Sequence, residues 1–189
     1  MTDAAFDQEL VAALPRLRRF AFGLAGSLDE ADDLVQAACE RALAHREQYE
    51  PGTRLVSWMY RIVQTIWIDR TRRHRPVSVD PATLAEYPGG DAMGEAESRL
   101  ALAEVRRAIA VLSPEQRTVL LLVSVEGLAY REAAEILGLP IGTIMSRLAR
   151  ARLALGKALE EPEARRDSGS NNPSGKSPDD KGAQVIKLR

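Results

Sequence analysis

The sequence predicts an all-α protein made of two small helical domains joined by a flexible linker. Alanine, leucine, arginine and glutamate, which favour helices, dominate the composition. Apolar residues recur at steps of three and four, and no long alternating run of β-branched residues is present. With 189 residues and 45% hydrophobic content, the chain can bury one medium core or two small ones.

The charge and the rare residue types exclude several functional classes. A formal net charge of −1 argues against a uniformly basic protein that coats DNA, although acidic and basic residues are segregated along the chain. The only cysteine, Cys39, excludes an intrachain disulfide, and His45 and His74 lack metal-ligand spacing. We therefore expect no metal and no cofactor. The sequence shows neither a signal peptide nor a membrane span, so we expect a cytoplasmic protein without membrane insertion.

The first domain is predicted at residues 1–75 and begins with a helix from Thr2 to Gly26. Pro15 is expected to restart this helix, because proline fits a first-turn position. The predicted buried stripe consists of Leu10, Leu14, Leu17, Phe20, Ala21 and Leu24.

A second helix is predicted from Leu28 to about Arg46, with Ser27 as its N-cap and Glu30 completing a capping box. Its predicted buried residues are Ala31, Leu34, Val35, Ala38, Ala42 and Leu43. Its outer face carries Asp29, Asp32, Asp33, Gln36 and Glu40. The helix dipole explains acidic residues in the first turn but not those further along. We therefore interpret this face as a docking surface for a basic partner.

A third helix is predicted from Leu55 to about His74, after a turn at Pro51-Gly52. Its predicted core stripe is Leu55, Trp58, Met59, Ile62, Val63 and Ile66. Its end is strongly basic, and Tyr60 and Trp67 are expected to add aromatic surface among the arginines. Aromatic rings beside cations suit single-stranded nucleic acid, because bases stack on the rings while guanidinium groups hold phosphates. The alternative is that both tryptophans belong to the core, and for Trp58 we favour it.

Residues 76–96 contain proline, glycine and acidic residues without Lys or Arg, which predicts a flexible acidic linker. The second domain is predicted at 97–159. Its first helix carries the apolar residues Leu100, Leu102, Val105, Ile109 and Leu112. The motif Ser113-Pro114-Glu115-Gln116 predicts a capped start for the next helix, whose VLLLV run should be buried nearly all round. Residues 160–189 lack periodicity and are predicted to form a disordered tail.

The stretch from Tyr130 to Leu159 predicts two helices joined by a tight corner at Gly138-Leu139-Pro140. The second of them carries an apolar stripe of Ile141, Ile144, Leu148, Ala151, Leu155 and Leu159. Its other face carries groups that bind phosphates and base edges: Thr143, Ser146, Arg147 and Arg150. One alternative is an ordinary helical hairpin with a solvated basic face. The converging polar groups favour a helix-turn-helix that enters the DNA major groove.

Three motifs, in their order and separation, together resemble one protein family. They are SLDEADDLVQAACERAL, PGTRLVSWMYRIVQTIWIDRTRR and LSPEQRTVLLLVSVEGLAYREAAEILGLPIGTIMSRLARAR. Over roughly Leu14 to Leu159, the chain resembles the extracytoplasmic-function (ECF) sigma factors of bacterial RNA polymerase. It is also similar to the subgroup that serves general stress responses in alphaproteobacteria. The resemblance implies a sigma region 2-like domain and a sigma region 4-like domain.

The resemblance also implies three binding surfaces. Core RNA polymerase would dock on Asp29, Asp32, Asp33, Gln36 and Glu40. The opened −10 element would contact Gln48, Arg54, Trp58, Arg61, Gln64, Trp67, Arg70, Arg72 and Arg73. The −35 element would be read as duplex by Thr143, Ser146, Arg147, Arg150 and Arg152. The polymerase would perform the chemistry, so we expect no catalytic residue and no small-molecule substrate, and an anti-sigma factor is an implied partner.

This chain departs from the family pattern at three places. Gln64-Thr65 stands where Arg-Asn is common, and Met145 stands where many members carry a basic residue. The first departure bears on the contacts to opened DNA, and the second bears on the −35 preference. Ala129 replaces the usual hydroxyl cap before the helix-turn-helix, at a cost of up to about 1 kcal/mol.

Two rival functions follow from the same elements. A sigma-like mimic would sequester an anti-sigma factor without binding DNA, but such proteins usually carry a receiver domain, for which we expect no room here. Mimics also lose basic recognition residues, whereas this chain keeps Arg147, Arg150 and the arginines at 70–73. A plain helix-turn-helix repressor would leave the acidic helix and the first domain without a role.

Overall fold

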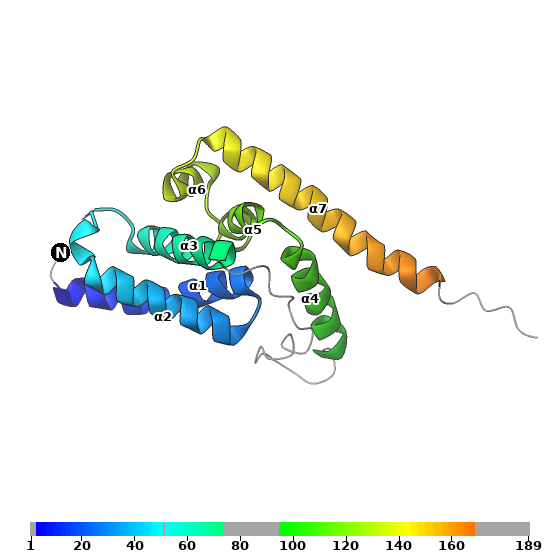
Figure 1. The fold of residues 1–189 in the computed structure, drawn as a ribbon, viewed down its shortest axis with the longest axis horizontal. Helices are drawn as coiled ribbons and strands as arrows, with labels where there is room; N and C mark the ends of the chain where they lie inside the picture. Colours follow the sequence, from blue (N-terminus) through cyan, green and yellow to red (C-terminus); the bar gives the residue numbers. More distant parts are fainter. Residues whose placement is uncertain (1–2, 51, 74–94, 169–189) are drawn as a thin grey trace, which may run out of the picture.

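The computed structural model describes residues 3–50, 52–73 and 95–168, with the side chains in these ranges except those of 95–100 and 161–168. Within these ranges the chain forms α-helices and no strand, which confirms the all-α fold class (Figure 1). The first module consists of α1 (Asp3–Ala25), α2 (Leu28–Ala44) and α3 (Leu55–Arg73). The second consists of α4 (Glu95–Ala110), α5 (Pro114–Leu120), α6 (Tyr130–Leu137) and α7 (Ile141–Ser168).

In the first module, α1, α2 and α3 pack against one another in a three-helix bundle (Figure 1). The Ser27 hydroxyl accepts the backbone N–H of Glu30 at 3.3 Å, which confirms the predicted N-cap of α2. Pro15 lies inside α1 without interrupting it, so the predicted restart is wrong. Buried Ala13 and Leu17, on either side of Pro15, hold both parts of the helix on one core.

In the second module, α5 begins with the predicted capping box, in which the side chains of Ser113 and Gln116 each accept the other's backbone N–H. It runs into η3 (Leu121–Val125), a π-helical turn that closes with a bond from the N–H of Glu126 to the carbonyl of Leu121 at 2.9 Å. The sequence pattern predicted a buried helix here but not this widened turn. Such turns are rare and often occur at functional sites.

The helix-turn-helix follows as α6 and α7. Gly138 ends α6 with φ of +63°, a left-handed conformation that glycine adopts without strain, as predicted. Pro140 lies just before α7 rather than in its first turn, and its carbonyl accepts the N–H of Thr143. α7 continues to Ser168, so residues 160–168 are helical where the tail was predicted to begin. The remainder of the predicted tail, and residues 76–94 of the predicted linker, lie outside the described ranges.

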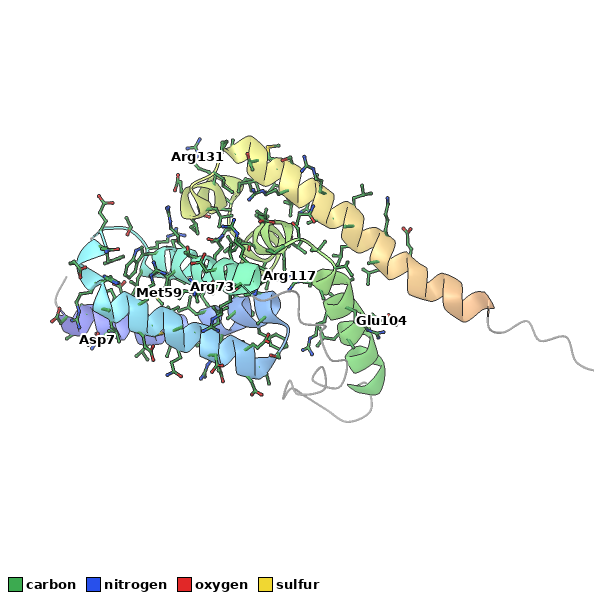
Figure 2. All side chains as sticks on the ribbon, viewed as in Figure 1. Asp7, Met59, Arg73, Glu104, Arg117 and Arg131 are labelled. Carbon is green, nitrogen blue, oxygen red and sulfur yellow. The ribbon has the colours of Figure 1, made fainter. Side chains whose placement is uncertain are left out.

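The two modules pack directly on each other, and their buried residues form one continuous cluster. α5, η3 and α6 lie against α1 and α3, while α7 runs diagonally across α5 and α6 and extends past α4 (Figure 1). Gly23 on α1 permits the close approach, since a Cβ atom there would lie 2.6 Å from the Leu121 side chain. Arg117, labelled in Figure 2, lies where α5 meets the ends of α1 and α4.

Leu43 was predicted to be buried but is 40% exposed. Three residues of the predicted apolar patterns are exposed as well: Leu102 at 46%, Ile141 at 48%, and Val105. Each continues the apolar periodicity of its helix, yet its side chain is exposed among the residues that the structure describes. The periodicity of a helix shows which side is apolar, but it does not show whether another element covers that side.

Candidate functional site

The predicted acidic docking face lies on the outer side of α2. Asp29, Asp32, Asp33, Gln36 and Glu40 are all exposed, so the structure brings the five residues together on one surface. Asp32 pairs with Arg18 of α1 at 3.0 Å, and the Gln36 amide donates to Glu40 at 3.0 Å. An ion pair this exposed contributes little stability, so Arg18 can give way to a basic partner. The surface is solvent-accessible and predominantly acidic.

A pocket on the first module unites some of the residues predicted to hold opened DNA. Gln48, Trp58 and Arg61 line it together with Arg41, His45, Ile62 and Thr65. Trp58 is half-buried and packs edge-on against the Phe6 ring and at a tilt against the Tyr49 ring, at centroid distances of 6.3 and 5.6 Å. The pocket therefore combines a fixed aromatic surface with guanidinium groups, which suits a stacked base and its phosphate.

Other residues that were predicted to contact the opened −10 element face the second module. The Arg54 guanidinium pairs with Glu132 of α6 at 2.9 Å, and Gly138 lies against the Arg61 guanidinium group. Gln64 and Arg72 line a groove between the modules whose opposite wall includes Arg147 of α7. By contrast, Arg70 reaches the Asp33 carbonyl at 3.4 Å, and Arg73 is exposed.

The expectation that Tyr60 and Trp67 supply aromatic surface is wrong in this arrangement. Tyr60 is fully buried against Phe20, and Trp67 is 6% exposed. Trp67 lies under the guanidinium group of Arg117, 5.4 Å from the ring centroid. Phe20 of α1 packs on the Tyr60 ring and Glu126 of the second module accepts its hydroxyl, while Arg117 of the second module covers Trp67. The pattern of α3 alone contains no information about these neighbours.

The predicted duplex-reading face lies on the first turns of α7. Thr143, Ser146 and Arg147 are half-buried and Arg150 is exposed, and all four are on one side of the helix. The Ser146 hydroxyl donates to the carbonyl of Thr143 at 3.1 Å. Arg152 is exposed but lies away from these four, because two further residues rotate the side chain by about 200° from Arg150. The structure therefore does not bring Arg152 together with the rest.

Sequence reasoning missed two groups of residues at these surfaces. Arg41 and His45, one helical turn apart at the end of α2, line the first-module pocket that contains Trp58. Their spacing of four residues was a usable signal. Glu126 and Arg117 join the modules, and no sequence signal separates Glu126 from an ordinary helix-ending Glu-Gly pair.

Within the described ranges, no three His, Cys, Asp or Glu side chains are grouped closely enough to hold a metal ion. None of the helices that the structure describes combines the length and the apolar composition of a membrane span.

Two family models match the chain, one in each module. Sigma-70, region 4 matches residues 102–155, and the sigma2 domain of PhyR matches residues 10–64. These two matches, together with the all-α fold, place the chain in the sigma-factor class. The chain is 39% identical over 164 residues to the ECF RNA polymerase sigma factor EcfG of Rhodopseudomonas palustris, a match that covers 84% of this chain and 87% of EcfG. This chain belongs to the ECF RNA polymerase sigma factors.

A further relative and two solved structures are consistent with this family. The chain is 33% identical to the ECF sigma factor SigE of Mycolicibacterium smegmatis, with 74% of this chain and 56% of SigE covered. The sigma factor RpoE of Bartonella quintana, solved with the anti-sigma factor NepR, is 32% identical with a TM-score of 0.65, covering 82% of this chain and 97% of RpoE. The anti-anti-sigma factor PhyR of the same organism, at 20% identity and a TM-score of 0.56, shares the fold; 80% of this chain and 49% of PhyR are covered.

Proposed function

We propose that this chain binds core RNA polymerase and directs promoter-specific initiation of transcription in the cytoplasm. The α2 face would dock on the polymerase, the α3 surface would hold the opened −10 strand, and α7 would read the −35 duplex. The chain would supply recognition and no catalytic group, and the polymerase would form the phosphodiester bonds. The observation that carries the proposal is the 39% identity to EcfG over nearly the whole of both chains.

The three surfaces support this division of labour physically. Duplex DNA is read by a helix in the major groove, and the polar face of α7 presents hydroxyl and guanidinium groups for that purpose. Opened strands need stacking surface and cations, which the Trp58 pocket combines. The acidic α2 face is unsuited to DNA, since phosphate would repel it, and it is therefore free for a protein partner.

We further infer control by an anti-sigma factor within a general stress response. The support is the likeness to RpoE, a sigma factor that was solved in complex with the anti-sigma factor NepR. Such a partner would hold the chain away from the polymerase until the stress signal releases it.

One experiment tests the proposed function directly. The purified chain is added to bare core polymerase with a genomic DNA template, and transcript starts are mapped. We expect co-elution with the core and starts at a small set of sites that are absent without the chain. If the chain binds the core but no new starts appear, or if it fails to bind the core, the proposal is wrong.

A second function is favoured by one observation, the match of residues 10–64 to the sigma2 domain of PhyR. A mimic of this kind would bind an anti-sigma factor and neither core polymerase nor DNA. The two functions are separated by adding a second sigma factor and NepR to this reconstitution. A mimic would restore transcription by the inhibited sigma factor while initiating none itself.

A further inference from the structure

The first turns of α7 carry an exposed apolar row beside their polar groups. Residues four positions apart lie above one another on a helix, because four residues make slightly more than one turn. The apolar row consists of Ile141, Met145 and Ala149, all of them exposed. The neighbouring row contains Ser146 and Arg150, which belong to the predicted duplex-reading face. Apolar and hydrogen-bonding groups therefore lie side by side on this surface.

The packing of α7 within the described chain does not use this apolar row. Ile141 is 48% exposed and Met145 is 52% exposed. The same helix buries another side, which carries Ile144, Leu148 and Ala151. Water in contact with large apolar side chains is unfavourable, so a partner that covers the row would gain stability. The row is thus a surface available for binding rather than part of the core.

The start of α7 has room for a close partner. Gly142 is exposed between the apolar row and Thr143, and a Cβ atom built on it would meet no neighbouring group within 4 Å. No Asp or Glu occurs between Ile136 and Lys157, so no carboxylate of this segment repels phosphate. The major groove of B-DNA, about 12 Å wide, admits a helix. A helix that enters with this side would bring both rows to the base edges.

Thymine is the base that fits the apolar row. Its 5-methyl group stands on the major-groove edge, where apolar side chains contact it. The other three bases present donors and acceptors at that edge, and Met145 has no donor and only a weakly accepting sulfur. Its flexible, polarizable side chain adapts to a methyl group. A protein partner is disfavoured, because two large apolar side chains are far fewer than a stable protein interface uses.

We propose that Met145, with Ile141 beside it, receives the 5-methyl group of a thymine in the −35 element. The two rows would then read the duplex by different means: Ser146 and Arg150 by hydrogen bonds, and Met145 by burial of a methyl group. Such a contact selects a base without adding a charge, so it does not increase the salt dependence of binding. The proposal rests on the proposed function and deepens it by naming a group that α7 selects.

Deoxyuridine isolates this contact, because it differs from thymidine only by lacking the 5-methyl group. Core polymerase is reconstituted with the chain, and a promoter is taken from the mapped transcript starts. Each thymine of its −35 element, on either strand, is replaced singly by deoxyuridine, and binding is measured by competition with the unmodified promoter. We expect one replacement to weaken binding about fourfold, the effect of burying one methyl group.

The same replacements in Met145→Ala assign the contact to the side chain. We expect the sensitive position to become insensitive in this variant, because the methyl group then has no partner. The proposal is overturned if no position is sensitive in the parent chain, if Met145→Ala keeps the full sensitivity, or if the −35 element contains no thymine on either strand.

Two further variants and one control separate apolar contact from other effects. Met145→Leu conserves apolar volume and should keep the sensitivity to deoxyuridine. Met145→Lys should lose it and make the salt dependence steeper by about one phosphate contact. Val111→Ala is the control, since Val111 lies between α4 and α5 and is 69% exposed. It should behave as the parent chain, and loss of sensitivity in this control would overturn the assignment to Met145. Circular dichroism establishes that all variants stay helical.

The two proposals fail in distinguishable ways. If the reconstituted polymerase initiates nowhere on unmodified DNA, the proposed function is wrong, and the thymine contact falls with it. If it initiates at specific sites and deoxyuridine changes nothing, only the role of Met145 is wrong.

Discussion

The Arg117 guanidinium group donates to the carbonyl of Leu24 at 2.6 Å, across the boundary between the two modules. It also donates to the carbonyl of Ala110 at 2.7 Å, so one side chain binds the C-terminal ends of both α1 and α4. Helix C-termini carry partial negative charge, which makes a cation there favourable. Burial lowers the pKa of Arg117 from its ordinary value. A guanidinium group is nevertheless suited to this site, because it supplies the two bonds to the Leu24 and Ala110 carbonyls.

Replacing Arg117 with methionine should therefore destabilise the closed chain. The apolar stem is kept while both bonds to backbone carbonyls are lost, and bonds to charged groups contribute about 1.5–3 kcal/mol each. We expect the free energy of unfolding in urea to fall by at least about 2 kcal/mol. Arg107→Met is the control, since among the described residues exposed Arg107 donates to the Ala103 carbonyl of its own helix. Equal losses in both variants would contradict the structural role of Arg117.

The contact of Glu126 with Arg16, Arg19 and Tyr60 should respond to acid only below the ordinary pKa of glutamate. Burial alone would raise the pKa of Glu126, but the bonds from Arg19, Tyr60 and Arg16 outweigh burial and lower it from its ordinary value of 4.5. A lowered pKa means that the stabilising contribution is complete above 4.5 and is lost as the pH falls through the lower, folded-state value. Burial and the bond to Glu126 raise the pKa of Tyr60, so ordinary alkaline conditions leave the bond from Tyr60 to Glu126 intact.

Fluorescence of Trp67 provides the measurement, because this ring is buried at the module boundary. In a Trp58→Phe background we expect constant emission from pH 8 to about 5 and a red shift only below 4.5. In the same background, Glu126→Gln should show red-shifted emission already at neutral pH. An acid transition in the parent chain centred above 4.5 would contradict the lowered pKa.

The start of α6 can be stabilised by one hydroxyl group. Ala129 occupies the N-cap position with an extended backbone and no side-chain acceptor, while Glu132 already accepts the N–H of Ala129 at 2.8 Å. Ala129→Ser would complete a capping box and should increase stability by about 1 kcal/mol. Thermal denaturation measures the change. Ala149→Ser, at an exposed position inside α7, should instead be slightly destabilising, so a gain there would refute the capping explanation.

Reversing one charge on α2 should affect polymerase binding selectively. Asp33 is exposed on the acidic face, and an arginine there would meet a basic partner surface at a cost on the order of several kcal/mol. We expect Asp33→Arg to lose well over tenfold in affinity for the core, measured by competition between sigma factors, while duplex binding is unchanged. The control is Asp7→Arg, an exposed charge reversal on α1 (Figure 2). Unchanged affinity in Asp33→Arg would exclude α2 as the docking face.

Local chemistry made the helix ends predictable. Ser27 and Ser113 cap their helices as predicted, and Gly138 adopts the left-handed conformation that its position before Pro140 indicated. These features depend on interactions within a few residues of the chain. The exposed acidic face of α2 was predictable for the same reason, since it follows from helical periodicity alone.

The contacts between modules were not predictable, because they depend on which helix covers which. The sequence placed Tyr60 and Trp67 on the surface among arginines, whereas Phe20 and Glu126 enclose Tyr60 and Arg117 covers Trp67. Glu126 follows a buried apolar run and precedes a glycine, a pattern typical of an exposed helix end. Its burial becomes understandable only when Arg16, Arg19 and Tyr60, which are distant in sequence, are seen around it.

Removing the guanidinium group of Arg150 should weaken recognition of duplex DNA and nothing else. Arg150 is exposed on the face of α7 that carries Thr143 and Ser146, and a bidentate contact to a base contributes about 1–3 kcal/mol. We expect Arg150→Ala to lower affinity for a −35 duplex roughly tenfold and to leave core affinity intact. Arg131→Ala is the matched control, because Arg131 is exposed on α6 (Figure 2). An equal loss of duplex affinity in both variants would mean that only net charge matters. A loss of core affinity in Arg150→Ala would mean that Arg150 contacts the polymerase rather than DNA.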